Sequence, residues 1–80
     1  MTLEVLLFAS YADAAGASRV QVVVPDGATV ADVVAAVRAA APAIPLPKRP
    51  LVAVNHRYAT PELAVAVGDE LALIPPVAGG

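Results

Sequence analysis

The residues of this sequence with the most distinctive chemistry are the last six, which begin with two prolines and end with two glycines. A proline has no N–H to donate to a neighbouring strand, so the proline pair ends any pairing that precedes it. The two glycines have no side chain and can enter a channel too narrow for a Cβ atom. We therefore expect an extended tail made of Pro75, Pro76, Val77, Ala78, Gly79 and Gly80.

The carboxylate of Gly80 is the reactive group that such a tail would present. A terminal carboxyl has an ordinary pKa of about 3.5 and is ionised at neutral pH, where it is a poor electrophile. Activation as an acyl-adenylate would make it an electrophile, and a sulfur donor could then convert it to a thiocarboxylate. The chain has no cysteine, so this carboxyl is the obvious group to carry sulfur. Glycine ends without any chemistry are also common in small domains, and the two glycines alone do not decide between these alternatives.

The remaining polar residues do not form a recognisable catalytic group. His56 stands alone in a predicted turn, and we interpret it as a solvated turn residue. A turn aspartate and a solvent-facing strand residue explain Asp69 and Glu70 better than a catalytic carboxylate pair does. Lys48-Arg49 is interpreted as a solvated loop, with a contact to an acidic partner as the alternative. Without a nucleophile–base pair or a cluster of metal ligands, we expect neither an intrinsic active site nor a bound metal or cofactor.

The composition sets limits on the partners of the chain. It has 80 residues, enough for one domain, with 59% hydrophobic residues, 15% charged residues and a net charge of -2. Such an apolar small body cannot hide all its aliphatic side chains, so we expect an exposed apolar patch that meets a partner. The basic residues are too few for a nucleic-acid surface. No apolar stretch is long enough to span a membrane and no basic signal-peptide segment opens the chain, so we expect a cytoplasmic protein.

The first half of the sequence predicts two strands and a helix. Residues 3–10 predict a strand with Leu3, Val5 and Leu7 on one face, and residues 11–16 a turn or short helical piece that ends at Gly16. Residues 19–24 predict a second strand, which can pair with the first as a hairpin. Thr29 and Asp32 form a capping-box pattern before an apolar stripe at helical spacing, and the helix must end before Pro42.

The second half predicts shorter elements. Residues 42–50 contain four prolines and predict a stiff connection with little regular structure. Residues 51–54 predict a short strand, and residues 57–58 a brief return strand after a turn at Asn55-His56. Residues 62–67 could form a helical turn, and residues 70–74 predict the last strand.

This order of elements predicts an α+β fold of the β-grasp kind, a mixed sheet of four to five strands with one main helix packed on one face. The predicted domain spans residues 1–74, and residues 75–80 form the tail. Because the helix covers one face of the sheet only, we expect strand residues that alternate with the core residues to lie on the uncovered face. These are Leu6, Phe8, Ala72 and Ile74, unless sheet curvature buries them.

Three segments of the sequence resemble one family across the whole chain. Val52-Ala53-Val54-Asn55, Gly68-Asp69-Glu70 and the run from Ile74 to Gly80 closely resemble the MoaD family, the small sulfur-carrier subunits of molybdopterin synthase. Val5 to Ala9 and Pro25 to Val30 look like the first strand and the helix entry of that family. The proline pair before the glycines is a specific feature. The related thiamine sulfur carriers, ThiS, share the fold and the glycines but usually lack the prolines.

The resemblance implies a ubiquitin-like sulfur carrier with a defined reaction cycle. An ATP-dependent, E1-like adenylyltransferase of the MoeB kind would adenylate Gly80, and a sulfurtransferase system would replace AMP with sulfur. The thiocarboxylated tail would enter the MoaE-like large subunit and give sulfur to cyclic pyranopterin monophosphate for molybdenum cofactor biosynthesis. ATP would be bound by the activating enzyme and no cofactor by this chain.

The resemblance also implies partners and interface positions. The synthase would be a heterotetramer of carriers and large subunits, and its interface positions fall by register on Phe8, Tyr58 and Ile74. Three alternatives remain open: a carrier for thiamine synthesis or tRNA thiolation, a ubiquitin-like protein conjugate, and a plain binding module whose tail is inert.

Overall fold

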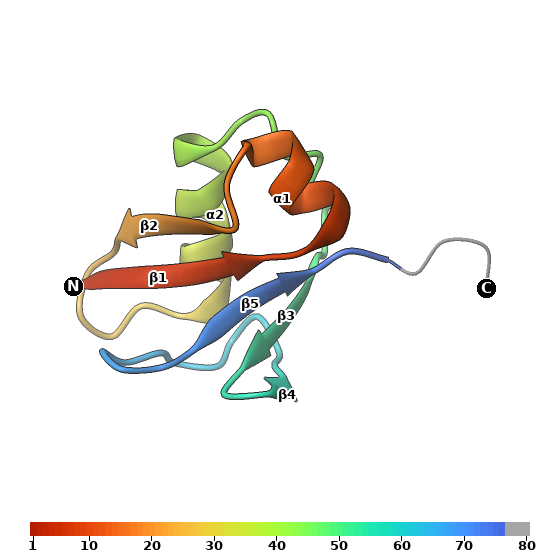
Figure 1. Ribbon diagram of the computed structural model, residues 1–80. Helices are drawn as coiled ribbons and strands as arrows, with labels where there is room; N and C mark the ends of the chain where they lie inside the picture. The colour runs from red at the N-terminus through yellow and green to blue at the C-terminus, as the bar shows by residue number, and fades with distance from the viewer. Residues whose placement is uncertain (77–80) are drawn as a thin grey trace.

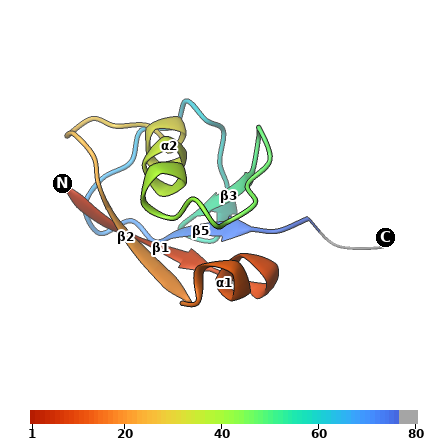
Figure 2. The same ribbon diagram turned by 90° about the horizontal axis from the view of Figure 1, so that it is seen from above.

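The computed structural model of the protein describes residues 1–76. These residues form one mixed five-stranded sheet in the order β2-β1-β5-β3-β4, with two helices. Figures 1 and 2 show α2 lying across one face of the sheet and α1 at the end of β1. The architecture is the predicted α+β β-grasp. Its elements are β1 (Thr2–Leu7), α1 (Ala9–Ala15), β2 (Arg19–Val23), α2 (Val30–Ala40), β3 (Leu51–Val54), β4 (Arg57–Tyr58) and β5 (Leu71–Ile74).

The two central strands, β1 and β5, come from opposite ends of the chain and run parallel. Val5 lies opposite Leu71, and Leu7 lies opposite Leu73. β2 pairs antiparallel with the other side of β1, and β3 pairs antiparallel with the other side of β5. β5, the strand that leads into the predicted tail, is therefore hydrogen-bonded to a neighbour on both sides.

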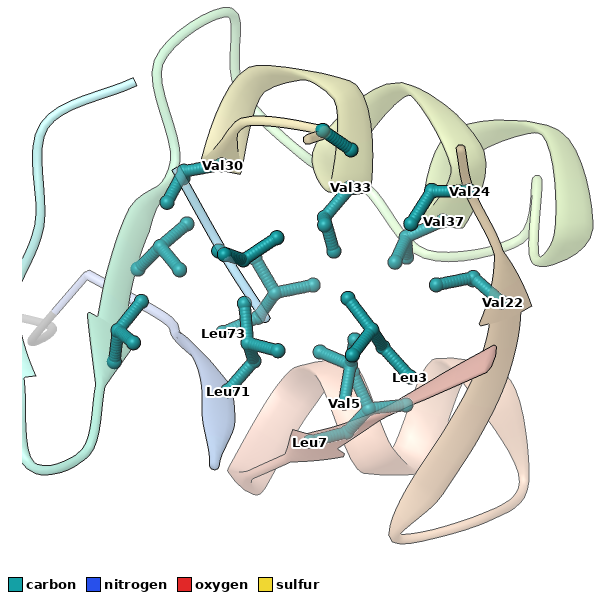
Figure 3. Packing of buried hydrophobic residues seen from close by; sticks show 14 of the residues in the cluster. Leu3, Val5, Leu7, Val22, Val24, Val30, Val33, Val37, Leu71 and Leu73 are labelled. Atoms are coloured by element: carbon teal, nitrogen blue, oxygen red, sulfur yellow. The ribbon is translucent and has the colours of Figure 1, made fainter. Parts of the chain in front are cut away.

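The hydrophobic core lies between the sheet and α2. The alternation along β1 buries Leu3, Val5 and Leu7, as the sequence predicts, and these side chains face α2 together with Leu71 and Leu73 (Figure 3). Burying an aliphatic side chain of this size contributes about 1.5–3 kcal/mol. The helix supplies its own apolar stripe to this core, namely Val30, Val33 and Val37.

The start of α2 confirms the predicted capping box. The Asp32 N–H donates to the Thr29 hydroxyl at 3.4 Å, and the Thr29 N–H donates to the Asp32 carboxylate at 2.9 Å. Both bonds satisfy N–H groups that a helix leaves without partners, and the carboxylate interacts favourably with the helix dipole. The helix ends at Ala40, before Pro42.

The predicted strand over residues 3–10 is too long, because β1 ends at Leu7 and α1 begins at Ala9. The short helical piece is confirmed, and it ends at Gly16, whose φ of 69° suits a glycine cap. α1 is part of the connection between β1 and β2, which pair antiparallel as predicted. Tyr11, assigned to a turn or short helical piece from the sequence, is buried in the core.

The Tyr11 hydroxyl has no hydrogen-bond partner among the described residues. Burial raises the pKa of Tyr11 above 10.0, while the positive charge of Arg38 acts in the opposite direction. Because a buried hydroxyl without a partner costs free energy, the aromatic ring is the part of Tyr11 that stabilises the fold.

The predicted helical turn at residues 62–67 is wrong. Ala64 instead forms an isolated antiparallel bridge with Thr29, and the Val65 N–H donates to the Ala28 carbonyl at 2.9 Å. The segment is held by its contacts with the start of α2, which override a weak local preference for helix. The last strand begins at Leu71, one residue later than predicted.

Candidate functional site

The predicted tail begins at the end of β5. Ile74 is the last residue of this strand and lies opposite Leu51 of β3. Pro75 is half-buried and Pro76 is exposed. In Figure 1 the chain leads away from the sheet after β5. The remaining tail residues, Val77, Ala78, Gly79 and Gly80, lie outside the described residues.

The sheet face opposite α2 carries an apolar row that crosses four strands. Leu6 lies opposite Ala72, Ala72 opposite Ala53, and Ala53 opposite Tyr58. Residues that lie opposite each other in neighbouring strands share a face, with Cβ atoms about 4.5–5.5 Å apart. The row therefore connects β1 with the β4 edge of the sheet.

The structure places all three predicted interface residues on this same face. Phe8 follows Leu7 in extended conformation, so the alternation of β1 places it on the face of Leu6, one residue beyond the Leu7–Leu73 pair and towards the end of the sheet where Ile74 lies. Phe8 is 47% exposed and Tyr58 is 74% exposed. We call this surface the apolar face. It consists of Leu6, Phe8, Leu51, Ala53, Tyr58, Ala72 and Ile74.

The predicted parity of the uncovered face holds, and its four residues differ in exposure. Phe8 is exposed, whereas Leu6 and Ile74 are half-buried. Ala72 is buried by its neighbours within the sheet. The alternative that sheet curvature removes these residues from the surface therefore applies to Ala72 alone.

Leu51 and Ala53 are members of the apolar face that the sequence analysis did not single out. Both alternate with Val52 and Val54, which are buried against the core. Leu51 is 50% exposed and lies directly beside Ile74. This alternation within residues 51–54 is the signal that could have identified them.

The other half of the same sheet face is mostly polar, although Val23, which lies opposite Thr2, is 77% exposed on it. Glu4 of β1 and Arg19 of β2 form an ion pair at 3.1 Å, and both side chains are largely exposed. Gln21 lies opposite Glu4 in the adjacent pair of strands. The uncovered face thus divides into a charged half over β1 and β2 and an apolar half that extends to the base of the tail.

Asp69 and Glu70 lie at the opposite end of β5. Asp69 closes a turn that begins at Ala66, and Glu70 follows this turn just before β5, so it is not the strand residue that the sequence predicts. The Asp69 carboxylate accepts hydrogen bonds from the Ala66 N–H at 2.8 Å and from the Asn55 amide at 3.1 Å. These bonds lower the pKa of Asp69 below 3.8 because they favour the ionised form. The Asn55 amide oxygen accepts from the Glu70 N–H at 2.9 Å. The turn interpretation of Asp69 is therefore confirmed.

His56 occupies the two-residue turn between β3 and β4 and is largely solvated, as the sequence predicts. Its Nε2 lies 2.8 Å from the Glu70 carboxylate, and its side chain is 86% exposed. Exposed ion pairs contribute at most about 1 kcal/mol.

Residues 1–76 contain no group of three or more His, Asp or Glu side chains that could hold a metal ion. Neither helix in this range is long and apolar enough to cross a membrane. The arrangement of the described residues favours presentation of the predicted tail to a partner, because a central strand leads into Pro75 and Pro76 beside the apolar face.

The model of the ThiS family matches residues 5–80 of this chain. A curated relative from Chlamydomonas reinhardtii, named molybdopterin synthase sulfur carrier subunit, is 37% identical over 83 residues, and the match covers 100% of both sequences.

Two solved structures from Haloferax volcanii are similar in both sequence and fold. SAMP1 is 39% identical, with a TM-score of 0.87 and 100% of both chains covered. Small archaeal modifier protein 1 is also 39% identical, with a TM-score of 0.84 over 95% of this chain and 98% of that chain.

Proposed function

The chain belongs to the ThiS family, and we propose that it is a sulfur carrier that holds sulfur on the terminal carboxyl of Gly80, as the small subunit of molybdopterin synthase. The observation that carries this proposal is the full-length identity of 37% with a curated carrier subunit of that name. The absence of cysteine supports it, because the chain has no thiol to hold sulfur in another way.

In the proposed cycle this chain is a co-substrate whose end is chemically changed. An E1-like adenylyltransferase joins the Gly80 carboxylate to AMP from ATP and releases pyrophosphate. A sulfurtransferase system then replaces AMP with sulfur and leaves a thiocarboxylate. In the large subunit, the thiocarboxylate sulfur bonds to cyclic pyranopterin monophosphate and displaces an oxygen substituent. Water then hydrolyses the resulting thioester, which leaves the sulfur on the pterin and returns Gly80 to a carboxylate. ATP binds to the activating enzyme, and the pterin binds to the large subunit.

The geometry of the described residues supports delivery into a partner. Phe8 and Ile74 flank the base of the tail, so a partner that covers the apolar face is also positioned to receive the chain end. Covering exposed apolar surface stabilises such a complex by about 25 cal/mol for each Å² removed from water. Six residues from Pro75 onward can reach at most about 20 Å when extended. We expect the large subunit to form the heterotetramer through this face.

The direct test is mass spectrometry of the full chain after incubation with ATP, an E1-like adenylyltransferase and a sulfur donor. We expect a mass gain equal to the replacement of one oxygen by one sulfur, located on the C-terminal peptide. A variant without Gly79 and Gly80 should gain nothing while its melting temperature stays unchanged. If the intact chain gains no sulfur under conditions that charge a known carrier, the proposal is wrong.

A second candidate function is attachment of the same carboxyl to an amine of another protein. The 39% identity with a structure named a modifier protein favours it. In this case the adenylate would be attacked by an amine, forming an amide and releasing AMP, and conjugates of higher mass would accumulate. Genetic complementation distinguishes a molybdopterin carrier from a carrier for thiamine synthesis or tRNA thiolation. Rescue of a strain that lacks the molybdopterin carrier supports the proposed role in molybdopterin synthase. Rescue of a thiamine or tRNA-thiolation defect alone contradicts that role.

A further inference from the structure

A groove of about 400 Å³ lies on the side of the molecule that carries α2. It runs between α2 and the segment that enters β3, and the chain after β4 closes its far side. Its apolar lining comes from Val34 and Ala35 of α2, from Pro50 and Leu51, and from Ala59 and Pro61. The groove is separate from the apolar face, which lies on the other side of the sheet, and Leu51 at the sheet margin borders both.

The groove is positively charged although the protein as a whole is acidic. Three of the five Lys and Arg residues line it, namely Arg38, Lys48 and Arg49, and none of its lining residues is Asp or Glu. The two carboxylates nearest to lining residues in the sequence are Asp32 and Glu62. Asp32 is engaged in the capping box, and Glu62 follows Pro61 without itself lining the groove. The charge at this surface is therefore opposite in sign to the net charge of -2.

The wall of the groove is fixed by Arg38. Its guanidinium donates to the carbonyl oxygens of Leu46 at 3.0 Å, of Pro47, and of Lys48 at 3.4 Å. These bonds tie the connection before β3 to α2, and the four prolines of residues 42–50 restrict that connection further. The groove is thus formed before any ligand binds, which lowers the entropic cost of binding.

Lys48 and Arg49 provide charge that the fold itself does not use. Both side chains are exposed, and neither forms an ion pair within residues 1–76. They lie beside the end of the sheet where the tail begins, because Leu51 follows them and lies opposite Ile74. A partner that receives the tail can therefore reach this groove as well.

We propose that this groove binds an extended segment of a partner protein that combines carboxylates with aliphatic side chains. The apolar lining removes aliphatic side chains from water, and the cationic rim pairs with Asp or Glu and selects against basic segments. A nucleic acid fits less well, since three cations neutralise few phosphates and the lining has no aromatic side chain on which a base could stack.

The test begins with selection of random peptides of about twelve residues, displayed on phage, against the full chain. We expect enriched peptides to carry Asp or Glu next to Leu, Ile or Val. A synthetic peptide of the enriched sequence should shift the NMR amide signals of Ala35, Leu51 and Ala59 and leave that of Arg19, on the polar half of the sheet, unchanged. No enrichment, enrichment of neutral or basic peptides, or shifts confined to Phe8 and Tyr58 would overturn the proposal.

Charge reversal at the rim provides the second measurement. The double variant Lys48→Glu, Arg49→Glu should weaken peptide binding by at least about tenfold, and added salt should weaken binding to the original chain. The double variant Arg19→Glu, Arg57→Glu is the matched control, because it also reverses two exposed cations, neither of which lines the groove, and it should bind like the original chain. Equal binding by all three proteins, or displacement of the peptide by single-stranded RNA at equal concentration, would also overturn the proposal. Both variants should keep the original NMR fingerprint elsewhere.

Discussion

The two ends of β5 are built in opposite ways. At its start, the side chains of Asn55 and Asp69 bind two turns to each other and to the Glu70 N–H. At its end, Ile74 lies on the apolar face and is followed by two prolines that have no N–H to donate. The polar contacts are thus concentrated where the strand enters the sheet, and the end where the tail leaves presents apolar surface to a partner.

The difference shows how the fold fixes the position of the tail. A slip of one residue along β5 would turn Leu71 and Leu73 out of the core and move Ile74 to the other face. The Asn55 contacts oppose such a slip because they hold Glu70 in register with β3. The start of the strand therefore determines where the end emerges, and the end is left available for its partner. Four sets of substitutions test this division.

The largest effect should come from Leu71→Ala at the start of the strand. Leu71 is 0% exposed, and removing a buried leucine side chain costs about 2–5 kcal/mol. Ile74→Ala on the same strand should cost clearly less, because Ile74 is only half-buried, yet it should weaken binding of the large subunit. Chemical denaturation of both variants measures this. Equal losses of stability for Leu71→Ala and Ile74→Ala would contradict the idea that the start of β5 stabilises the fold more than its end does.

The next effect should come from Asn55→Ala. This change removes two hydrogen bonds and places alanine at a φ of 52°, in the left-handed region, at a combined cost of about 1–2 kcal/mol. Asn55→Gly is the control that keeps access to this φ, so it should lose less. If both variants unfold at the same denaturant concentration as the original chain, the Asn55 contacts do not hold the strand.

A pH-dependent effect should follow from Asp69→Asn. The pKa of Asp69 is lowered below 3.8 in the folded protein, so its ionised form stabilises the fold above that value. This contribution is lost as the pH falls through the lowered pKa. The melting temperature of the variant should therefore lie below that of the original chain near neutral pH, and the two should converge in strong acid. A constant difference at every pH would contradict the role of the charged form.

The smallest effect on stability should come from Pro75→Ala combined with Pro76→Ala. Pro75 is half-buried and Pro76 is exposed, and both follow the last strand, so the free energy of unfolding should change by less than about 0.5 kcal/mol. Sulfur loading and transfer, by contrast, should slow, because the stiff exit of the tail is lost. Unchanged rates would show that the prolines are dispensable for delivery.

Local signals predicted the parts of the fold that are locally determined. The capping box at Thr29 and Asp32 and the alternation of Leu3, Val5 and Leu7 are read directly from residue types and spacing. The start of α1 at Ala9, before the predicted residues 11–16, has no local signal, because Phe8 forms no side-chain cap and the first turn has no acidic residue. The possible helical turn at residues 62–67 is wrong because this segment pairs with Thr29 and Ala28, and such a tertiary contact is not visible in the local sequence.

The candidate site was predictable to a similar extent. Parity along β1 and β5 placed Phe8 and Ile74 on one face, since each follows a leucine that is buried in the core, Leu7 and Leu73 respectively. Leu51 and Ala53 were missed because only the pairing of β3 with β5 shows that these two residues lie on the same sheet face as Ile74. The groove beside α2 could not be predicted, because it depends on three hydrogen bonds from Arg38 to a connection without regular structure.

The parallel pairing of β1 with β5 also has a mechanical consequence. Met1 precedes one strand and the tail follows the other, so a pull applied between the two chain ends acts along both strands in opposite directions. Every hydrogen bond between these strands then resists the load together, in shear, instead of breaking one after another from an edge. A force that a partner applies to the tail is thus opposed by all hydrogen bonds between β1 and β5 at once. The domain can therefore stay folded when the partner pulls on the tail.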